Sequence, residues 1–248
     1  MNAKSFIEAC THLGLELSSE QVQAFEAFEE ELYRANEVMN LTRVPREECW
    51  VRHFVDSLLI QDLLPNGSAV VDLGTGPGFP AWPLACARPD LKVTAVDSSG
   101  KMLTFLRGRA LPNLTVVQSR AEELEAREQF SVVTGRALAP LPIQIEISAA
   151  QAVKDGRVIP MRSSNDLDTI NGFDASILGL RLSSIEHRPL PTTDVVRVFP
   201  VYDKVKSTPR QYPRKWAEIK KKPLPIYHAR GGKSEAHARS SDQAQEPS

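Results

Sequence analysis

The chain has 248 residues, of which 42% are hydrophobic and 25% charged, a composition that supports a folded core and excludes full-length disorder, collagen and a long coiled coil. The net charge of −1 conceals a gradient, because residues 1–50 carry an excess of six negative charges and residues 204–222 an excess of seven positive charges. No apolar run approaches the roughly 18 residues of a membrane-spanning helix and no apolar leader core follows Met1, so we expect a cytoplasmic protein with no membrane partner.

Residues 1–66 are predicted to form a helical extension. A helix start at Ser18 and Ser19 is followed by apolar side chains at steps of three and four: Val22, Phe25, Phe28 and Leu32. A second apolar stripe repeats every four residues: Trp50, Phe54 and Leu58. Polar residues accompany this second stripe. We expect Arg52, His53 and Asp56 to form a polar cluster on one helix, with an RNA-facing role as the functional alternative.

Residues 67–203 are predicted to form an α/β domain, because short apolar runs alternate with helical stretches. The expected strands are Ala69–Leu73, Lys92–Asp97, Leu114–Gln118, Phe130–Thr134 and Gly156–Met161, and the expected helices are 80–88, 99–110, 121–128 and 141–153. Strands that are apolar throughout indicate a parallel sheet covered on both faces. Two later runs, Ile177–Ile185 and Val195–Tyr202, lack a helix-length connection and are expected to pair as a hairpin at the sheet edge.

A glycine turn follows the first strand, where residues 72–78 read DLGTGPG. Glycines allow a tight turn and a close approach of the backbone to a ligand. The spacing GxGxG, the acidic Asp72 and the amide lost at Pro77 suit a cationic ligand better than a pyrophosphate. The matching ligand is S-adenosylmethionine, which carries ammonium and sulfonium charges.

Two further positions fit an adenosine. Asp97 ends the second strand, where a carboxylate can accept both ribose hydroxyls; the alternative is an ordinary helix cap. Ala121 and Glu122 follow the third strand and can flank an adenine ring with a small side chain and an acceptor, although an acidic residue there is more often surface charge.

Longer strings resemble one family. They are NLT at 40–42, WVRHFVDSL at 50–58, DLGTGPGFP at 72–80, VDS at 96–98, QSRAE at 118–122, RA at 136–137, YPRK at 212–215 and KKPL at 221–224. In order and spacing they are similar to the RsmG family, also called GidB. The resemblance implies a Rossmann-like methyltransferase with a seven-stranded, mostly parallel sheet and an N-terminal helical extension. It also implies methyl transfer from S-adenosylmethionine to N7 of a guanine in the 530 loop of 16S rRNA.

The resemblance assigns cofactor contacts to Gly74, Phe79, Ala121, Glu122 and Arg136, to which the glycine turn adds Gly76 and the second strand Asp97. The chain departs from the usual family pattern at three places: Ala81–Trp82, Gly135 and Arg162–Ser163. The indole is expected near the cofactor mouth, and these departures bear on the target pocket more than on cofactor binding.

The residues agree with methylation of a ring nitrogen that has a free lone pair. The chain contains no Pro-Pro clamp of the kind used for amine methylation, and no cysteine follows a proline, as cytosine-C5 transfer requires. Guanine N7 carries no proton to remove, so positioning and exclusion of water suffice and we name no catalytic residue. The three scattered cysteines and the spacing of the five histidines indicate neither disulfides nor a metal site.

Residues 204–228 form a predicted basic segment with eight Lys or Arg side chains among residues 204–222, and residues 229–248 are predicted to be a disordered tail. Tyr212 and Trp216 lie between the cations as stacking faces for unpaired bases. Such a segment indicates an RNA partner, 16S rRNA alone or within the 30S subunit or its assembly intermediate; the alternative is a solvated tail. A non-catalytic cofactor-dependent RNA-binding protein and a small-molecule methyltransferase of the same fold remain the alternative functions.

Overall fold

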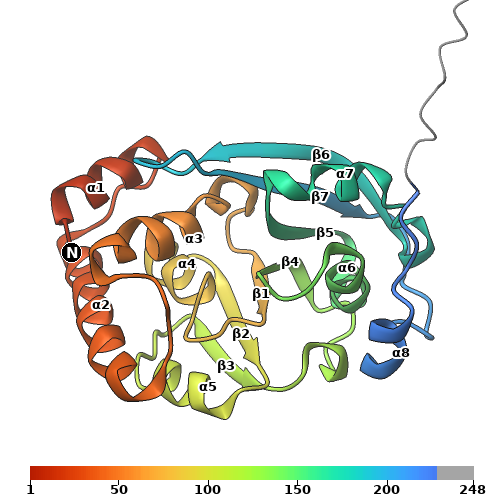
Figure 1. Cartoon of the computed structure of the whole chain (residues 1–248), viewed down its shortest axis with the longest axis horizontal. Coiled ribbons are helices and arrows are strands. Elements are labelled where there is room, and N and C mark those ends of the chain that lie inside the picture. The colour runs from red at the N-terminus through yellow and green to blue at the C-terminus, as the bar shows by residue number, and fades with distance from the viewer. Residues whose placement is uncertain (228–248) are drawn as a thin grey trace, which may run out of the picture.

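A computed structural model describes residues 1–227, so the predicted tail at 229–248 lies outside the described residues. It contains a seven-stranded sheet in the order β3-β2-β1-β4-β5-β7-β6 (Figure 1). The strands are β1 (Ala69–Leu73), β2 (Lys92–Asp97), β3 (Leu114–Gln118), β4 (Phe130–Arg136), β5 (Ala152–Ser163), β6 (Leu180–Pro189) and β7 (Val196–Lys204). Strands β1 to β5 pair in parallel, and the hairpin β6–β7 adds antiparallel to β5. The predicted fold class is confirmed.

Helices cover both faces of the sheet because its central strands are apolar on both sides. The helices are α1 (Ala3–His12), α2 (Ser19–Met39), α3 (Asp56–Leu58), α4 (Ala81–Ala87), α5 (Gly100–Arg107), α6 (Leu141–Ala149), α7 (Leu167–Gly172) and α8 (Trp216–Lys221). The N-terminal helices, α4 and α5 share one hydrophobic cluster with one face of the sheet, and α6 packs with α7 and α8 on the other. Figure 1 shows these two layers on either side of β1 and β4.

The helical extension begins as expected at Ser18, which caps α2. The Ser18 hydroxyl accepts a hydrogen bond from the Gln21 amide, and the Gln21 side chain accepts one from the Ser18 amide. The second stripe forms a π-helix at Trp50–Val55 that continues into α3.

Two expectations about local structure are wrong. The helix expected at 121–128 is a single 3-10 turn, Ala121–Glu123, because the backbone becomes extended at Leu124 and left-handed at Glu128. Trp82 does not lie at the cofactor mouth. Its ring is 3% exposed and packs against Phe25 and Phe28, with ring centroids 5.3 and 4.2 Å away, because α4 turns this side chain toward α2.

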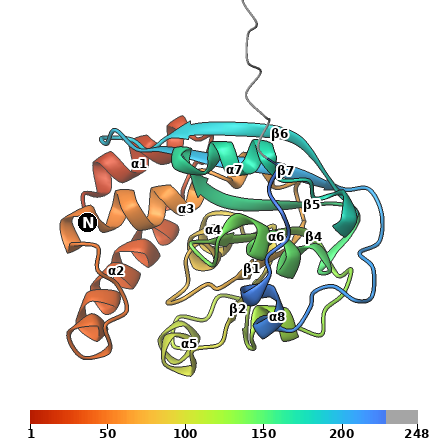
Figure 2. The same cartoon turned by 45° about the vertical axis from the view of Figure 1, so that its right-hand side comes forward.

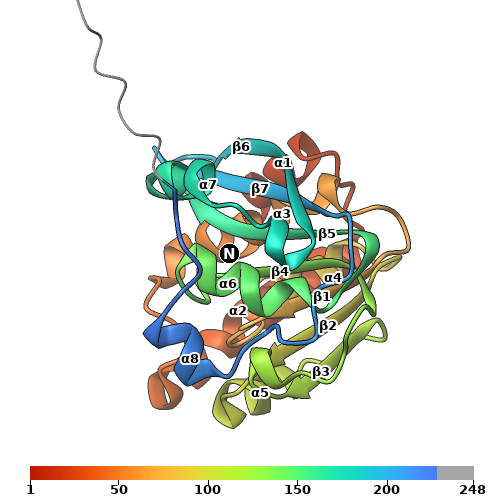
Figure 3. The same ribbon diagram turned by 90° about the vertical axis from the view of Figure 1, so that its right-hand side faces the viewer.

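The basic segment after β7 returns across the domain instead of leaving it. The predicted boundary at residue 204 falls inside β7, and the chain then passes beside α6, forms α8 and reaches α7 (Figures 2 and 3). Arg214 pairs with the buried Glu146 of α6, and Ile219 of α8 is fully buried. Tyr212 is 7% exposed, so the expectation that it offers a stacking face to RNA is wrong.

Candidate active site

The glycine turn leads directly from β1 and adopts a backbone that favours glycine. Gly74, Gly76 and Gly78 have φ angles of 76°, 56° and 122°, all in the left-handed region. A Cβ at Gly74 would lie 2.6 Å from Cδ1 of Leu138, whereas a Cβ at Gly76 would meet nothing within 4 Å. The turn therefore closes against Leu138 on one side and leaves open space on the other.

Asp97, at the end of β2, holds the turn in place. Its Oδ2 accepts a hydrogen bond from the Gly76 amide at 2.8 Å, and its Oδ1 accepts one from the Ser99 amide at 2.8 Å. A carboxylate has about four acceptor positions, so these two bonds leave capacity for a ligand's hydroxyl groups. The parallel pairing of β1 with β2 brings the two ends together, as the sequence predicted.

A cavity of about 120 Å³, here called the turn cavity, lies beside Asp97 and contains four of the predicted site residues: Gly74, Asp97, Ala121 and Glu122. Its other walls come from the ends of β2 and β3, from α6 and from α8; they include Val96, Ser98, Ser119, Arg120, Leu138, Ile147 and Trp216. Gly76 contributes through its bond to Asp97, but it does not line this cavity, and neither do Phe79 and Arg136.

Phe79 and Arg136 belong to a second group of side chains. The Phe79 ring is 3% exposed and lies parallel to the His53 ring, with centroids 4.2 Å apart and an interplanar angle of 2°. The Arg136 guanidinium lies 5.4 Å from the Phe79 centroid. Phe79 is therefore a buried support for His53 and Arg136.

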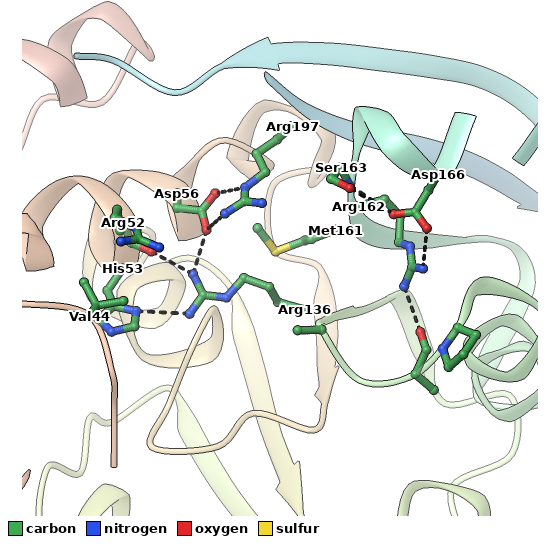
Figure 4. Close-up of a pocket in the computed structure, with 13 residues that line it drawn as sticks. Val44, Arg52, His53, Asp56, Arg136, Met161, Arg162, Ser163, Asp166 and Arg197 are labelled. Carbon is green, nitrogen blue, oxygen red and sulfur yellow. Dashed lines mark hydrogen bonds and ion pairs between the residues drawn. The ribbon is translucent and has the colours of Figure 1, made fainter. Parts of the chain in front are cut away.

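Arg136 lines a larger cavity of about 590 Å³, here called the arginine cavity (Figure 4). Asp56 is fully buried at its wall and accepts hydrogen bonds from Arg136 at 2.8 Å and from Arg197 at 2.6 and 3.1 Å. Arg136 also donates to the Arg52 carbonyl at 3.1 Å and approaches Nδ1 of His53 at 3.3 Å. The N-terminal extension, β4 and β7 thus meet at one ion network.

The opposite wall of the arginine cavity is built around Arg162, at the end of β5 (Figure 4). Arg162 donates to the Ala139 carbonyl at 2.8 Å and to the Gln144 side chain at 2.9 Å, and it pairs with Asp166 at 2.9 Å. The departure from the family pattern at 162 therefore lies in this cavity. The glycine at 135 has a packing reason, because a Cβ there would lie 2.6 Å from the Leu73 carbonyl oxygen.

Two buried groups have displaced proton affinities. Burial, assisted by the positive charges of Arg136 and Arg52, lowers the pKa of His53 to about 3, so this ring is neutral at physiological pH. Burial raises the pKa of Asp72 to about 7. Nε2 of His53 lies 2.7 Å from the Thr42 hydroxyl. The predicted cluster of Arg52, His53 and Asp56 on one helix is wrong in its partners, because Asp56 and His53 contact other segments.

The turn has features that fit a cationic nucleoside cofactor. Asp72 accepts a hydrogen bond from the Ala81 amide through Oδ2, while among residues 1–227 its buried Oδ1 and the Thr75 hydroxyl have no hydrogen-bond partner. An unpartnered buried carboxylate oxygen and open space beside Gly76 favour a ligand with positive charge.

The described part of the chain was also searched for metal and membrane features. Residues 1–227 hold no group of three or more His, Cys, Asp and Glu side chains placed to bind a metal ion. No helix in the same range combines the length and apolar character needed to cross a membrane.

Sequence reasoning missed three parts of the site: Arg197, Asp166 and the place of Trp216 in the turn cavity. Asp56 alone carried a signal, because an acidic residue within the apolar stripe of Trp50, Phe54 and Leu58 must be buried and therefore paired. Its partner Arg197 lies 141 residues away, and nothing in the local pattern connects the two.

Comparisons with known proteins agree on one family. The family model described as "GidB: rRNA small subunit methyltransferase G" matches residues 21–190. A "Ribosomal RNA small subunit methyltransferase G" from Lysinibacillus sphaericus is 34% identical over 90% of this chain and 100% of its own length; one from Limosilactobacillus reuteri is 35% identical with the same coverage. In fold, the chain is similar to the 1,6-didemethyltoxoflavin-N1-methyltransferase of Burkholderia thailandensis, with a TM-score of 0.50, 14% identity, and coverage of 73% of this chain and 89% of that one.

Proposed function

The chain belongs to the GidB family of rRNA small subunit methyltransferases G, and from this we propose that it transfers a methyl group from S-adenosylmethionine to N7 of a guanine in the 530 loop of 16S rRNA. It is an S-adenosylmethionine-dependent enzyme acting on rRNA. The specific atom and loop are those that the family resemblance implies.

The cofactor is proposed to bind along the glycine turn. Bound there, S-adenosylmethionine supplies a methyl group on a sulfonium sulfur. Asp97 holds the turn through Gly76 and keeps acceptor positions for ribose hydroxyls, and Ala121 and Glu122 border the adenine. Asp72 offers negative charge beneath the turn. Phe79 is proposed to act indirectly, by supporting the side of the site on which Arg136 lies.

The target guanine is proposed to enter the arginine cavity. Four arginines and two carboxylates line it, so its formal charge of about +2 suits an RNA strand: Arg52, Arg136, Arg162, Arg197, Asp56 and Asp166. Both carboxylates are engaged by arginines, and His53 is neutral and buried against Phe79. A chemistry that needs no general base is consistent with this lining, because N7 of guanine presents a lone pair without a proton.

The rest of the RNA is proposed to contact the C-terminal segment. Two of its eight cations are used within the fold, since Lys204 is buried and Arg214 pairs with Glu146. The other six side chains are exposed: Lys206, Arg210, Lys215, Lys220, Lys221 and Lys222. They can bind phosphates of 16S rRNA alone or within a 30S subunit or its assembly intermediate, in the cytoplasm.

The observation that carries this proposal is the meeting of two cavities at the carboxyl ends of the parallel strands, one beside the glycine turn and one lined by arginines. The test uses the purified protein, labelled S-adenosylmethionine and 30S subunits from cells that lack this methyltransferase. Label should enter 16S rRNA, and small molecules extracted from the same cells should take up none. Cofactor binding without transfer to any RNA would favour a non-catalytic RNA-binding protein and would contradict the proposal.

A further inference from the structure

The basic C-terminal segment contributes a wall to the turn cavity. Trp216, the first residue of α8, lines this cavity together with Asp97, Ala121 and Glu122 from the ends of β2 and β3. Among the lining residues in the described chain it is the one aromatic side chain. The indole is half-buried, so one part of it borders the cavity while another meets solvent.

The indole is held by a charged neighbour that also belongs to the cavity. The guanidinium carbon of Arg120 lies 5.3 Å from the centre of the Trp216 ring, within the range of a cation–π contact. Arg120 also pairs with Glu122, whose side chain is only 6% exposed. Trp216, Arg120 and Glu122 therefore form one continuous end wall.

Anchors on both sides of Trp216 fix the position of α8. Before it, Arg127 donates to the carbonyls of Thr208 and Tyr212 at 2.8 and 2.7 Å, and Arg214 pairs with the fully buried Glu146. After it, Ile219 is fully buried in the cluster that includes α6. Figure 3 shows α8 seated beneath α6, with the chain continuing up to α7. Such anchoring presents the indole to the cavity as part of the folded domain.

We propose that Trp216 is an adenine-binding residue, so that the C-terminal segment completes the cofactor site from the side opposite the glycine turn. This inference rests on the proposed binding of S-adenosylmethionine at the turn. An aromatic face beside a small apolar wall of Ala121 and Ile147 suits a flat purine, and stacking of a base on an aromatic ring is favourable whatever the base edge does.

The size of the cavity adds a second reason. At about 120 Å³ it is smaller than the roughly 300 Å³ at which small-molecule sites begin, so a wall must shift when the cofactor binds. The strand ends are fixed by the sheet. Trp216 lies on a helix of six residues, and Leu138 follows a residue in left-handed conformation, Ala137 with φ of 53°. Binding should therefore change the surroundings of the indole.

The test compares Trp216→Ala and Trp216→Phe with the wild type in calorimetric titrations of S-adenosylhomocysteine. Loss of the stacking face should weaken affinity by roughly 5- to 150-fold in Trp216→Ala, and Trp216→Phe should recover most of it. KM for S-adenosylmethionine should rise in Trp216→Ala, while kcat at saturating cofactor stays within about twofold of the wild type. Thermal unfolding of each variant identifies any loss of fold.

Fluorescence provides a readout that a purely structural role would not change. Adenosine should alter tryptophan emission in the wild type and in the Trp50→Phe control, but not in Trp216→Phe, and methionine alone should alter none of them. Asp97→Ala separates this inference from the cofactor site itself. Weakened binding in Asp97→Ala with wild-type binding in Trp216→Ala would overturn the role of Trp216 alone. Unchanged binding in both variants would overturn the placement of the cofactor as well.

Discussion

Replacement of Asp56 by Asn tests whether the buried ion network positions Arg136. Asp56 is fully buried and accepts three hydrogen bonds from Arg136 and Arg197, with lengths of 2.6 to 3.1 Å. An Asn side chain keeps the volume but removes the negative charge and replaces one acceptor oxygen with a donor. Two guanidinium groups would then face a neutral amide, and their mutual repulsion would no longer be compensated.

The cost follows from the geometry. Breaking a buried ion pair by removing one partner costs about 3–5 kcal/mol in free energy of unfolding. Side-chain exposures of 17% for Arg136 and 28% for Arg197 allow water to recover part of this loss. We therefore expect about 3 kcal/mol for Asp56→Asn. The matched control is Asp62→Asn, because Asp62 is 52% exposed and its pair with Arg188 should contribute about 0–1 kcal/mol.

Urea denaturation of the two variants measures this difference, and calorimetry with S-adenosylhomocysteine should give wild-type affinity for both. The kcat/KM for 30S subunits should fall by about 100-fold in Asp56→Asn, because a displaced Arg136 no longer orients the target. Asp62→Asn should methylate normally. Equal stability of the two variants, or a loss of cofactor affinity as large as the loss of activity, would refute this reasoning.

Three further perturbations have defined outcomes. Gly74→Arg should abolish cofactor binding, because even a Cβ at residue 74 meets Leu138 at 2.6 Å; near-wild-type calorimetry of the folded variant would place the cofactor elsewhere. Replacing the exposed Lys220, Lys221 and Lys222 by Ala should weaken RNA binding uniformly and flatten the salt slope by about 0.7–0.9 per lost phosphate contact, with cofactor affinity kept; an unchanged slope would identify a merely solvated segment. His53 has a pKa of about 3 when folded and 6.5 as its ordinary value, so the unfolded state binds more protons and stability is lost as pH falls below 6.5. His53→Gln should remove up to about 1.4 kcal/mol per pH unit of that slope, and an identical slope in both proteins would contradict a buried neutral ring.

Much of the fold could be predicted from the sequence because strand periodicity and turn chemistry are local. Uniformly apolar runs at β1 and β2 indicate parallel strands buried on both faces, and the glycine turn after β1 contains the left-handed residues that only glycine adopts freely. The same patterns do not fix the extent of short elements. At 121–128 the extended backbone of Leu124 ends the turn after Glu123, and composition alone does not reveal this.

The half of the candidate site that depends on long-range packing could not be predicted. The direction in which Trp82 points is decided by the aromatic core of α2, and the role of Trp216 depends on a segment that returns across α6. Asp56 and Arg197 form a pair that joins the N-terminal extension to the edge hairpin. Local pattern carries Gly74 and Asp97 to one strand edge, whereas only the tertiary structure shows which cations surround the second cavity.

The most direct test of the proposed function is the position of the methyl group on the product. 16S rRNA from subunits methylated by this protein is treated with borohydride and then aniline, which cleave where N7 methylation has made a guanine ring cationic and open to reduction. Primer extension then locates the break. We expect one new cleavage, at a guanine of the 530 loop, that depends on the protein and on S-adenosylmethionine. Methyl incorporation without cleavage, with the label on ribose or an exocyclic amine, would contradict transfer to N7.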